Sequence, residues 1–130
     1  MKIRNGFVSN SSSSSFLILS KNGELSNEIL LNCFDVSDKS PLYPMVKQIV
    51  KEIINSSEEL TIDEYIQNYY DDEEDMKEFN PIRYEMIEKV RKNNWKIYIG
   101  DADSYDQPAL CEMELNYEDD NILIEKEGGY

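Results

Sequence analysis

The 130-residue chain contains no histidine, the side chain that most often serves as a general base and as a metal ligand. Its five glycines form neither GxxxxGK[ST] nor GxGxxG, which excludes the common phosphate-cradling loops. Serine is abundant, but there is no GxSxG motif and no histidine to activate a serine nucleophile. We therefore expect a protein that is not an enzyme, with no catalytic residue, no metal and no cofactor.

Cysteines and long apolar runs are also scarce. Cys33 and Cys111 lie far apart without CxxC spacing, which indicates reduced, buried thiols. No apolar run approaches the ~18–20 residues of a membrane span. The run Phe16–Leu19 is too short for the core of a signal peptide. These absences favour an unprocessed cytoplasmic protein without a membrane partner.

The chain is instead rich in carboxylates. It has 27 Asp and Glu against 13 Lys and Arg, a formal net charge of −14. A magnitude of ~2–8 suffices to keep a small domain soluble. Such a charge repels nucleic acid and anionic membranes and attracts basic surfaces. Ten acids lie between residues 58 and 78 and ten more between 101 and 127, and basic residues gather between them at Arg83, Lys89, Arg91, Lys92 and Lys96.

The densest acidic segment is the run of five carboxylates Asp71–Asp75. Carboxylates are unfavourable at a helix C-terminus and favourable at an N-terminus, so the run is predicted to be an exposed connection or the polar start of a helix. Carboxylates one helical turn apart lie about 6 Å apart, comparable with phosphates along one strand, so an acidic face can occupy a groove built for nucleic acid. The candidate partner-binding residues are Asp63, Glu64, Asp71, Asp72, Glu73, Glu74, Asp75 and Glu78.

Apolar residues at helical spacing predict three helices. The first is expected from Pro41 to Ile54, and the second from a capping box at Thr61 to about Tyr70. The third follows an Asn80-Pro81 cap, and its expected buried residues are Ile82, Met86, Ile87 and Val90.

Apolar residues at a spacing of two predict strands on either side of these helices. The expected strands cover residues 16–19, 95–99, 109–117 and 122–124, and Gly100 is expected to end the second. One strand, three helices and three further strands predict an α+β fold with one mostly antiparallel sheet. A single domain is expected over residues 1–130.

The N-terminal segment is distinctive. A basic residue precedes Gly6–Asn10, which is followed by the serine run Ser11–Ser15 and then Phe16. This segment resembles the opening of small uncharacterised proteins of bacteriophages and mobile elements. The resemblance implies a phage setting in a bacterial host cell, and it implies no activity. Small acidic phage proteins include inhibitors of host defence.

Together these features favour a non-enzymatic acidic binding protein of phage type. It would inhibit a basic, nucleic-acid-handling host protein as a nucleic-acid mimic, for example as an anti-CRISPR protein, without binding nucleic acid itself. One alternative is a phage structural or assembly-associated protein that docks through residues 1–15. Another is an acidic surface that only keeps the protein soluble.

A calcium-responsive module is the weakest alternative. Asp101, Asp103 and Glu112 occupy positions 1, 3 and 12 of an EF-hand-like loop. Tyr105 and Asp106 stand where that loop needs a short oxygen ligand and a glycine, and the flanks read as strands. The segment therefore predicts a solvated acidic loop and no metal site.

Overall fold

The computed structural model describes residues 14–102 and 116–127 of the chain. Within these residues the strands are β1 (Ser14–Ser20), β2 (Ser57–Leu60), β3 (Lys96–Ala102), β4 (Asn116–Glu118) and β5 (Ile122–Glu127). The helices are α1 (Asn27–Phe34), α2 (Tyr43–Ser56), α3 (Ile62–Tyr69), α4 (Glu73–Phe79) and α5 (Pro81–Asn93). This order confirms an α+β fold, with more helices and strands than the sequence predicted.

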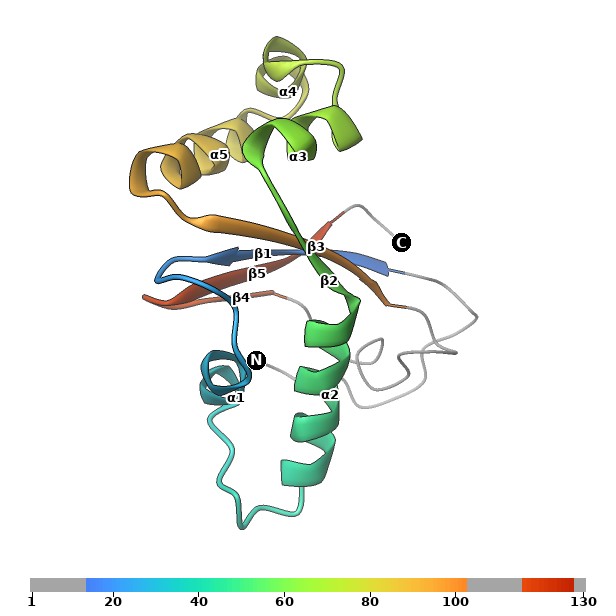
Figure 1. Ribbon diagram of the computed structural model, residues 1–130, viewed down its shortest axis with the longest axis vertical. Coiled ribbons are helices and arrows are strands. Elements are labelled where there is room, and N and C mark those ends of the chain that lie inside the picture. The colour runs from blue at the N-terminus through green and yellow to red at the C-terminus, as the bar shows by residue number, and fades with distance from the viewer. Residues whose placement is uncertain (1–13, 103–115, 128–130) are drawn as a thin grey trace.

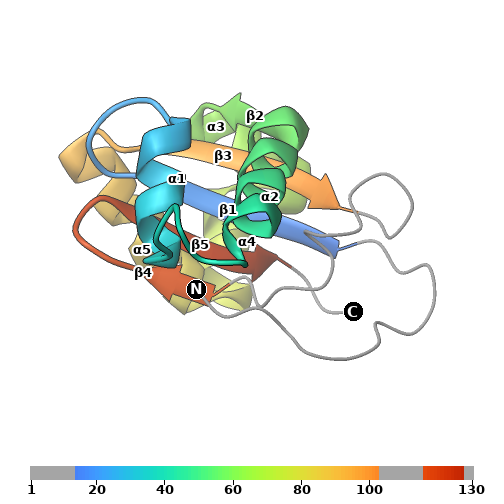
Figure 2. The ribbon, with the colours of Figure 1, turned by 90° about the horizontal axis from the view of Figure 1, so that it is seen from below.

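The strands form one antiparallel sheet in the order β2-β3-β1-β5-β4. The first strand of the chain, β1, lies at its centre, where Leu17 is opposite Ile99 of β3 and Glu125 of β5. Helices cover both faces: α3, α4 and α5 lie on one side, and α1 and α2 lie on the other (Figures 1 and 2). The fold therefore has three layers.

The central position of β1 explains its continuous apolar run. Phe16, Leu17, Ile18 and Leu19 are each 0% exposed. Successive side chains of a strand point to opposite faces. Phe16 and Ile18 accordingly pack beneath α1 and α2, whereas Leu17 and Leu19 pack beneath α3, α4 and α5. The predicted N-terminal strand is confirmed, and the helices on both faces of the sheet pack on it.

Each face of the sheet has its own hydrophobic core. The α1–α2 core contains Phe16, Ile18, Leu30, Cys33, Phe34, Val46, Ile49, Val50, Ile53, Ile122 and Ile124. The α3–α5 core contains Leu17, Leu19, Tyr65, Ile66, Met76, Ile87, Val90 and Ile97. The prediction that Cys33 is a buried thiol is confirmed, and burial raises its pKa to about 11. Cys111 lies outside the described residues.

Two helices begin at the caps that the sequence predicts. At the start of α3, the Thr61 hydroxyl accepts a hydrogen bond from the Glu64 N–H, and the Glu64 carboxylate accepts one from the Thr61 N–H. At the start of α5, the Asn80 side chain accepts a hydrogen bond from the Arg83 N–H, and Pro81 occupies the first turn. Short contiguous motifs are sufficient for both starts because every partner lies within three residues.

Three elements were not predicted. The helix α1 begins at a Ser26 cap and buries Leu30, Cys33 and Phe34, a stripe too short to stand out in the sequence. The strand β2 follows α2 without a turn and exposes Glu58 and Glu59, so it has no apolar alternation. It is a strand because it pairs with the outer edge of β3. The third is α4, which holds most of the acidic run.

The C-terminal strands correct one prediction and confirm another. Gly100 does not end a strand, because β3 continues through it to Ala102 and pairs with β1 along this length. The hairpin predicted for the last two strands is confirmed by the antiparallel pairing of β4 with β5. Residues 109–115 of the strand predicted over 109–117 lie outside the described residues.

The predicted buried side of α5 was wrong at Ile82, which is 76% exposed. The row that faces the sheet is Arg83, Ile87 and Val90. The Arg83 guanidinium lies 3.2 Å from the Glu125 carboxylate of β5, and this ion pair belongs to the same row. Placing this row against the sheet turns Ile82, one residue before it, toward solvent.

The serine run is described only at its end. Ser14 and Ser15 open β1, and the Ser15 hydroxyl donates a 2.6 Å hydrogen bond to Asp101 of β3. Residues 1–13, which carry the resemblance to phage proteins, lie outside the described residues. Among the helices that are described, none has the length and apolar character needed to cross a membrane.

Candidate partner-binding surface

The acidic run forms the connection from α3 to α4 and the first turn of α4. The Asp72 carboxylate caps α4 by accepting a 2.8 Å hydrogen bond from the Asp75 N–H. The Asp75 carboxylate in turn accepts a 3.1 Å hydrogen bond from the Asp71 N–H. Negative charge in a first turn is favoured by the helix dipole. The run is therefore both an exposed connection and the polar start of a helix, although of a helix separate from α5.

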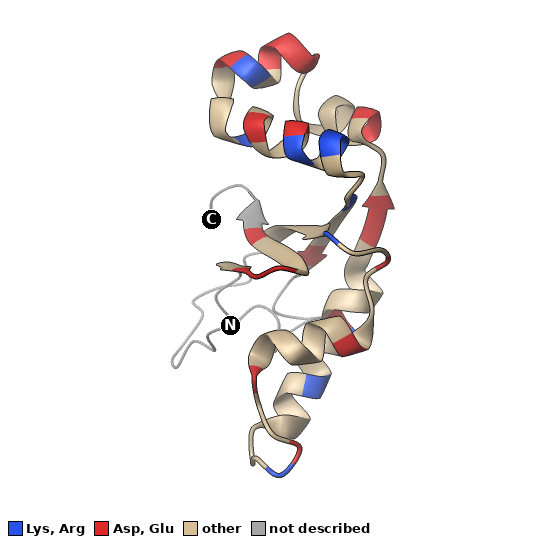
Figure 3. Cartoon of the chain, turned by 90° about the vertical axis from the view of Figure 1, so that its left-hand side faces the viewer, with Lys and Arg blue, Asp and Glu red and all other residues tan. Residues whose placement is uncertain are grey.

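One carboxylate of the run is directed toward α5. The Glu73 carboxylate lies 2.8 Å from the Arg91 guanidinium, and both side chains are partly exposed. This hydrogen bond raises the pKa of Arg91, which also pairs with Glu88. An exposed ion pair contributes about 0–1 kcal/mol to stability. Figure 3 shows acidic and basic residues on both α4 and the helix α5 beneath it. Glu73 is thus used within the molecule.

Three carboxylates of α4 and its approach remain open to solvent. Asp71, Glu74 and Glu78 are exposed, and their side chains make no hydrogen bond or ion pair within the described residues. Their surroundings form a shallow depression of about 540 Å³, lined by Asp71, Asp72, Glu74, Asp75, Lys77 and Glu78. The structure thus brings five of the eight predicted partner-binding residues to one place.

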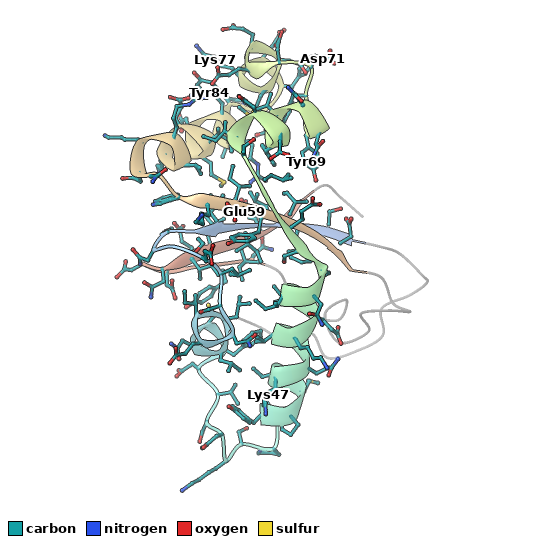
Figure 4. The ribbon with its side chains drawn as sticks, viewed as in Figure 1. Lys47, Glu59, Tyr69, Asp71, Lys77 and Tyr84 are labelled. Carbon is teal, nitrogen blue, oxygen red and sulfur yellow. The ribbon has the colours of Figure 1, made fainter. Side chains whose placement is uncertain are left out.

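The basic residue of this depression is engaged elsewhere. The Lys77 ammonium lies 5.5 Å from the centre of the Tyr84 ring on α5, within the range of a cation–π interaction. Figure 4 shows Lys77 and Tyr84 on the same side of α4 and α5, with Asp71 on the opposite side. Lys77 is one basic residue among five carboxylates in the lining, so the depression is negatively charged overall.

Two predicted residues lie apart from this depression. Asp63 and Glu64 occupy the first turn of α3, at the opposite end of that helix from Asp71. A helix of eight residues is about 12 Å long. Glu64 is also held in the capping box with Thr61. The sequence predicted Asp63 and Glu64 as part of the candidate surface because they are close to the acidic run in the chain. In the structure, the length of α3 separates them from it.

Basic residues line a different hollow at the far end of the molecule. A groove of about 660 Å³ between α1 and α2 is lined by Asn27, Leu31, Tyr43, Pro44, Lys47, Gln48, Val50 and Lys51. Lys47, which is labelled on α2 in Figure 4, lies at this end of the molecule. Its ammonium lies 5.8 Å from the centre of the Tyr43 ring. The lining of this groove holds two lysines and no carboxylate, in contrast to the depression beside α4.

A second cluster of titratable groups holds the β4–β5 turn together. The Asp119 carboxylate accepts hydrogen bonds from the amides of Asn121 and Ile122 and from the Tyr117 hydroxyl. Burial acts to raise the pKa of Asp119, but these hydrogen bonds outweigh it and lower the pKa. The hydrogen bond that the Tyr117 hydroxyl donates to Asp119 raises the pKa of Tyr117 to about 12. Since every group has a local partner, this cluster is structural.

The alternatives from the sequence fall mostly outside the described residues. Of the three carboxylates at EF-hand-like spacing, only Asp101 is described, and it accepts the hydrogen bond from Ser15. In the part of the chain that is described, no three Cys, Asp or Glu side chains gather as metal ligands. The expectations that the chain is not an enzyme and binds no metal stay predictions.

The sequence did not identify two apolar residues beside the acidic run. Phe79 ends α4 and is 73% exposed, and Ile82 lies just beyond it in α5. The only signal for Phe79 was its place directly before the Asn80-Pro81 cap, between two helices rather than in an apolar stripe.

Comparison with known proteins returned no match: no protein-family model, no curated protein and no solved structure is similar to this chain.

Proposed function

We propose that this chain is a non-enzymatic acidic protein that binds a basic, nucleic-acid-handling protein through α4 and thereby blocks access of nucleic acid. The observation that supports this most is the exposed group Asp71, Glu74 and Glu78, whose side chains have no partner within the described residues. The neighbouring carboxylates Asp72 and Glu73 cap α4 and pair with Arg91, respectively, whereas these three leave their charge available to a partner.

Charge is suited to this role because it acts before contact. Complementary potentials raise association rates and orient the encounter, and salt screens them within ~10 Å at 0.1 M. Glu74 and Glu78 lie one helical turn apart on α4, so their charges form a row rather than a point. A basic groove that follows a phosphate backbone offers a matching row of Lys and Arg.

The resemblance of residues 2–16 to phage proteins supports a particular class of partner. In a bacterial host cell, a phage protein of this kind would act in the cytoplasm on a defence nuclease, such as a CRISPR effector or restriction enzyme, or on a polymerase factor. Occupation of the nucleic-acid groove would inhibit such a protein without any chemical step.

The test compares two variants with the same change in charge. The variant Asp71→Asn/Glu74→Gln/Glu78→Gln and the control Glu24→Gln/Asp38→Asn/Asp120→Asn each remove three exposed carboxylates, which changes the net charge from −14 to −11. Immobilised wild type should capture nucleic-acid-binding proteins from bacterial lysate at low salt, and duplex DNA should displace them. The α4 variant should bind an identified prey about tenfold more weakly, since each exposed charge contributes under ~1 kcal/mol.

The control variant should retain most of the affinity. Equal binding of an identified prey by both variants at low salt would contradict a role for α4. Prey that duplex DNA does not displace would contradict the nucleic-acid-mimic mechanism.

A further inference from the structure

The junction of α4 and α5 exposes the two least buried large apolar side chains among the described residues. Phe79 is 73% exposed and Ile82 is 76% exposed, against 49% for Leu42, the next most exposed. Three residues of chain separate their Cα atoms by at most ~11 Å. The two exposed residues are therefore close neighbours at one helix junction, and we call this pair the apolar junction.

The fold does not use the apolar junction. The helix α4 is anchored in the α3–α5 core by Met76, which is 0% exposed, and α5 is anchored by Ile87 and Val90. The connection between the helices is capped by Asn80. Single exposed apolar residues are ordinary, whereas exposed apolar side chains that gather in one patch mark interaction sites.

The surroundings of the apolar junction indicate what covers it. Glu78 directly precedes Phe79 on α4, Glu74 lies one turn earlier on that helix, and Asp71 precedes its cap and lines the same depression. The cations closest in sequence to the junction are engaged, Lys77 with the Tyr84 ring and Arg83 with Glu125 of β5. An apolar centre with a charged rim is the usual composition of a protein interface.

We propose that the apolar junction is the anchor for a basic amphipathic helix of the partner protein. Such a helix presents an apolar stripe at i, i+3, i+4 and i+7 with Lys and Arg beside it. Its stripe would cover Phe79 and Ile82, and its basic residues would face Asp71, Glu74 and Glu78. This inference rests on the proposed basic partner and adds that the partner must bring apolar residues as well as charge.

Two synthetic peptides of about 18 residues, roughly five helical turns, test this inference. One has Leu at helical spacing (i, i+3, i+4 and i+7) and Lys at the other positions, so that it forms an amphipathic helix, and the other has Gln at every Leu position and the same charge. Fluorescence anisotropy should show that wild type binds the Lys–Leu peptide about tenfold more tightly than the Lys–Gln peptide, because only the former buries apolar surface.

Variants then locate the binding site. Phe79→Ser/Ile82→Ser should lose the preference for the Lys–Leu peptide and keep its salt dependence. The control Leu42→Ser/Met45→Ser removes two other exposed apolar residues, at the α2 end, and should keep the preference. The variant Asp71→Asn/Glu74→Gln/Glu78→Gln should weaken binding of both peptides and flatten the salt dependence.

The outcomes separate this inference from the proposed function. Equal, salt-sensitive binding of both peptides by wild type would overturn the anchor and leave charge-driven binding standing. A preference that survives in Phe79→Ser/Ile82→Ser would also overturn it. If neither peptide binds wild type at low salt, both the anchor and the basic partner fail.

Discussion

Gly100 shows how one residue can be required by a contact far away in sequence. A Cβ atom at this position would lie 2.3 Å from Cζ of Phe16 and 2.8 Å from the carbonyl oxygen of Ser56. Phe16 lies opposite Gly100 in the register of β1 and β3. The ring occupies the space of a missing side chain, so the glycine lets β1 and α2 approach β3 closely.

We predict that Gly100→Ala destabilises the protein by about 1–3 kcal/mol, the usual cost of forcing extra atoms into a packed site. Urea unfolding monitored by circular dichroism measures the difference. Phe16→Leu removes the atoms that the new methyl group would meet, so the same alanine should cost clearly less in that background. An unchanged urea midpoint for Gly100→Ala would contradict the close packing seen here.

At the scale of elements, α4 depends on its two ends and one anchor. It has seven residues, fewer than the ~12–15 that an isolated helix needs in water. The Asp72 cap, the acidic first turn and the Glu73–Arg91 pair stabilise it from outside, and buried Met76 attaches it to the α3–α5 core. The proposed binding surface therefore lies on an element with little stability of its own.

We predict that Asp72→Ala costs about 0.5–2 kcal/mol, the range for loss of an N-cap, whereas Asp72→Asn costs little because asparagine caps equally well. Hydrogen exchange should show the loss of protection first at the amides of α4, since this short helix can open locally. If Asp72→Ala exchanged like wild type throughout α4, the cap would not be what holds the helix.

At the scale of the whole molecule, the excess of negative charge opposes compactness. The described ion pairs use few of the 27 carboxylates, and each involves a partly exposed carboxylate. Such pairs contribute little, whereas a net charge of −14 acts as self-repulsion over the entire surface. Salt weakens both the ion pairs and the self-repulsion. The larger of the two effects decides whether added salt raises or lowers the stability of the protein.

We predict that salt stabilises this protein. Raising sodium chloride from about 10 mM to about 500 mM shortens the Debye length from ~30 Å to under ~8 Å and should raise the thermal midpoint. The variant Asp71→Asn/Glu74→Gln/Glu78→Gln should show a smaller rise, because it carries less charge. A midpoint that falls with salt would show that ion pairs such as Arg91–Glu73 outweigh the repulsion.

The sequence by itself determined the features that depend on a few neighbouring residues. The capping box at Thr61, the cap at Asn80 and the hairpin before Ile122 each have all their partners close in the chain. The apolar run Phe16–Leu19 identified a strand because it is bounded by polar segments.

Only the tertiary structure decided what depends on distant contacts. It made β2 a strand by pairing it with β3, and it made Gly100 a packing position rather than a strand end. It also turned Ile82 outward and divided one run of acids into carboxylates that cap or pair and others that stay open. A sequence pattern records charge and apolarity along the chain, whereas exposure and pairing depend on which surfaces other elements already occupy.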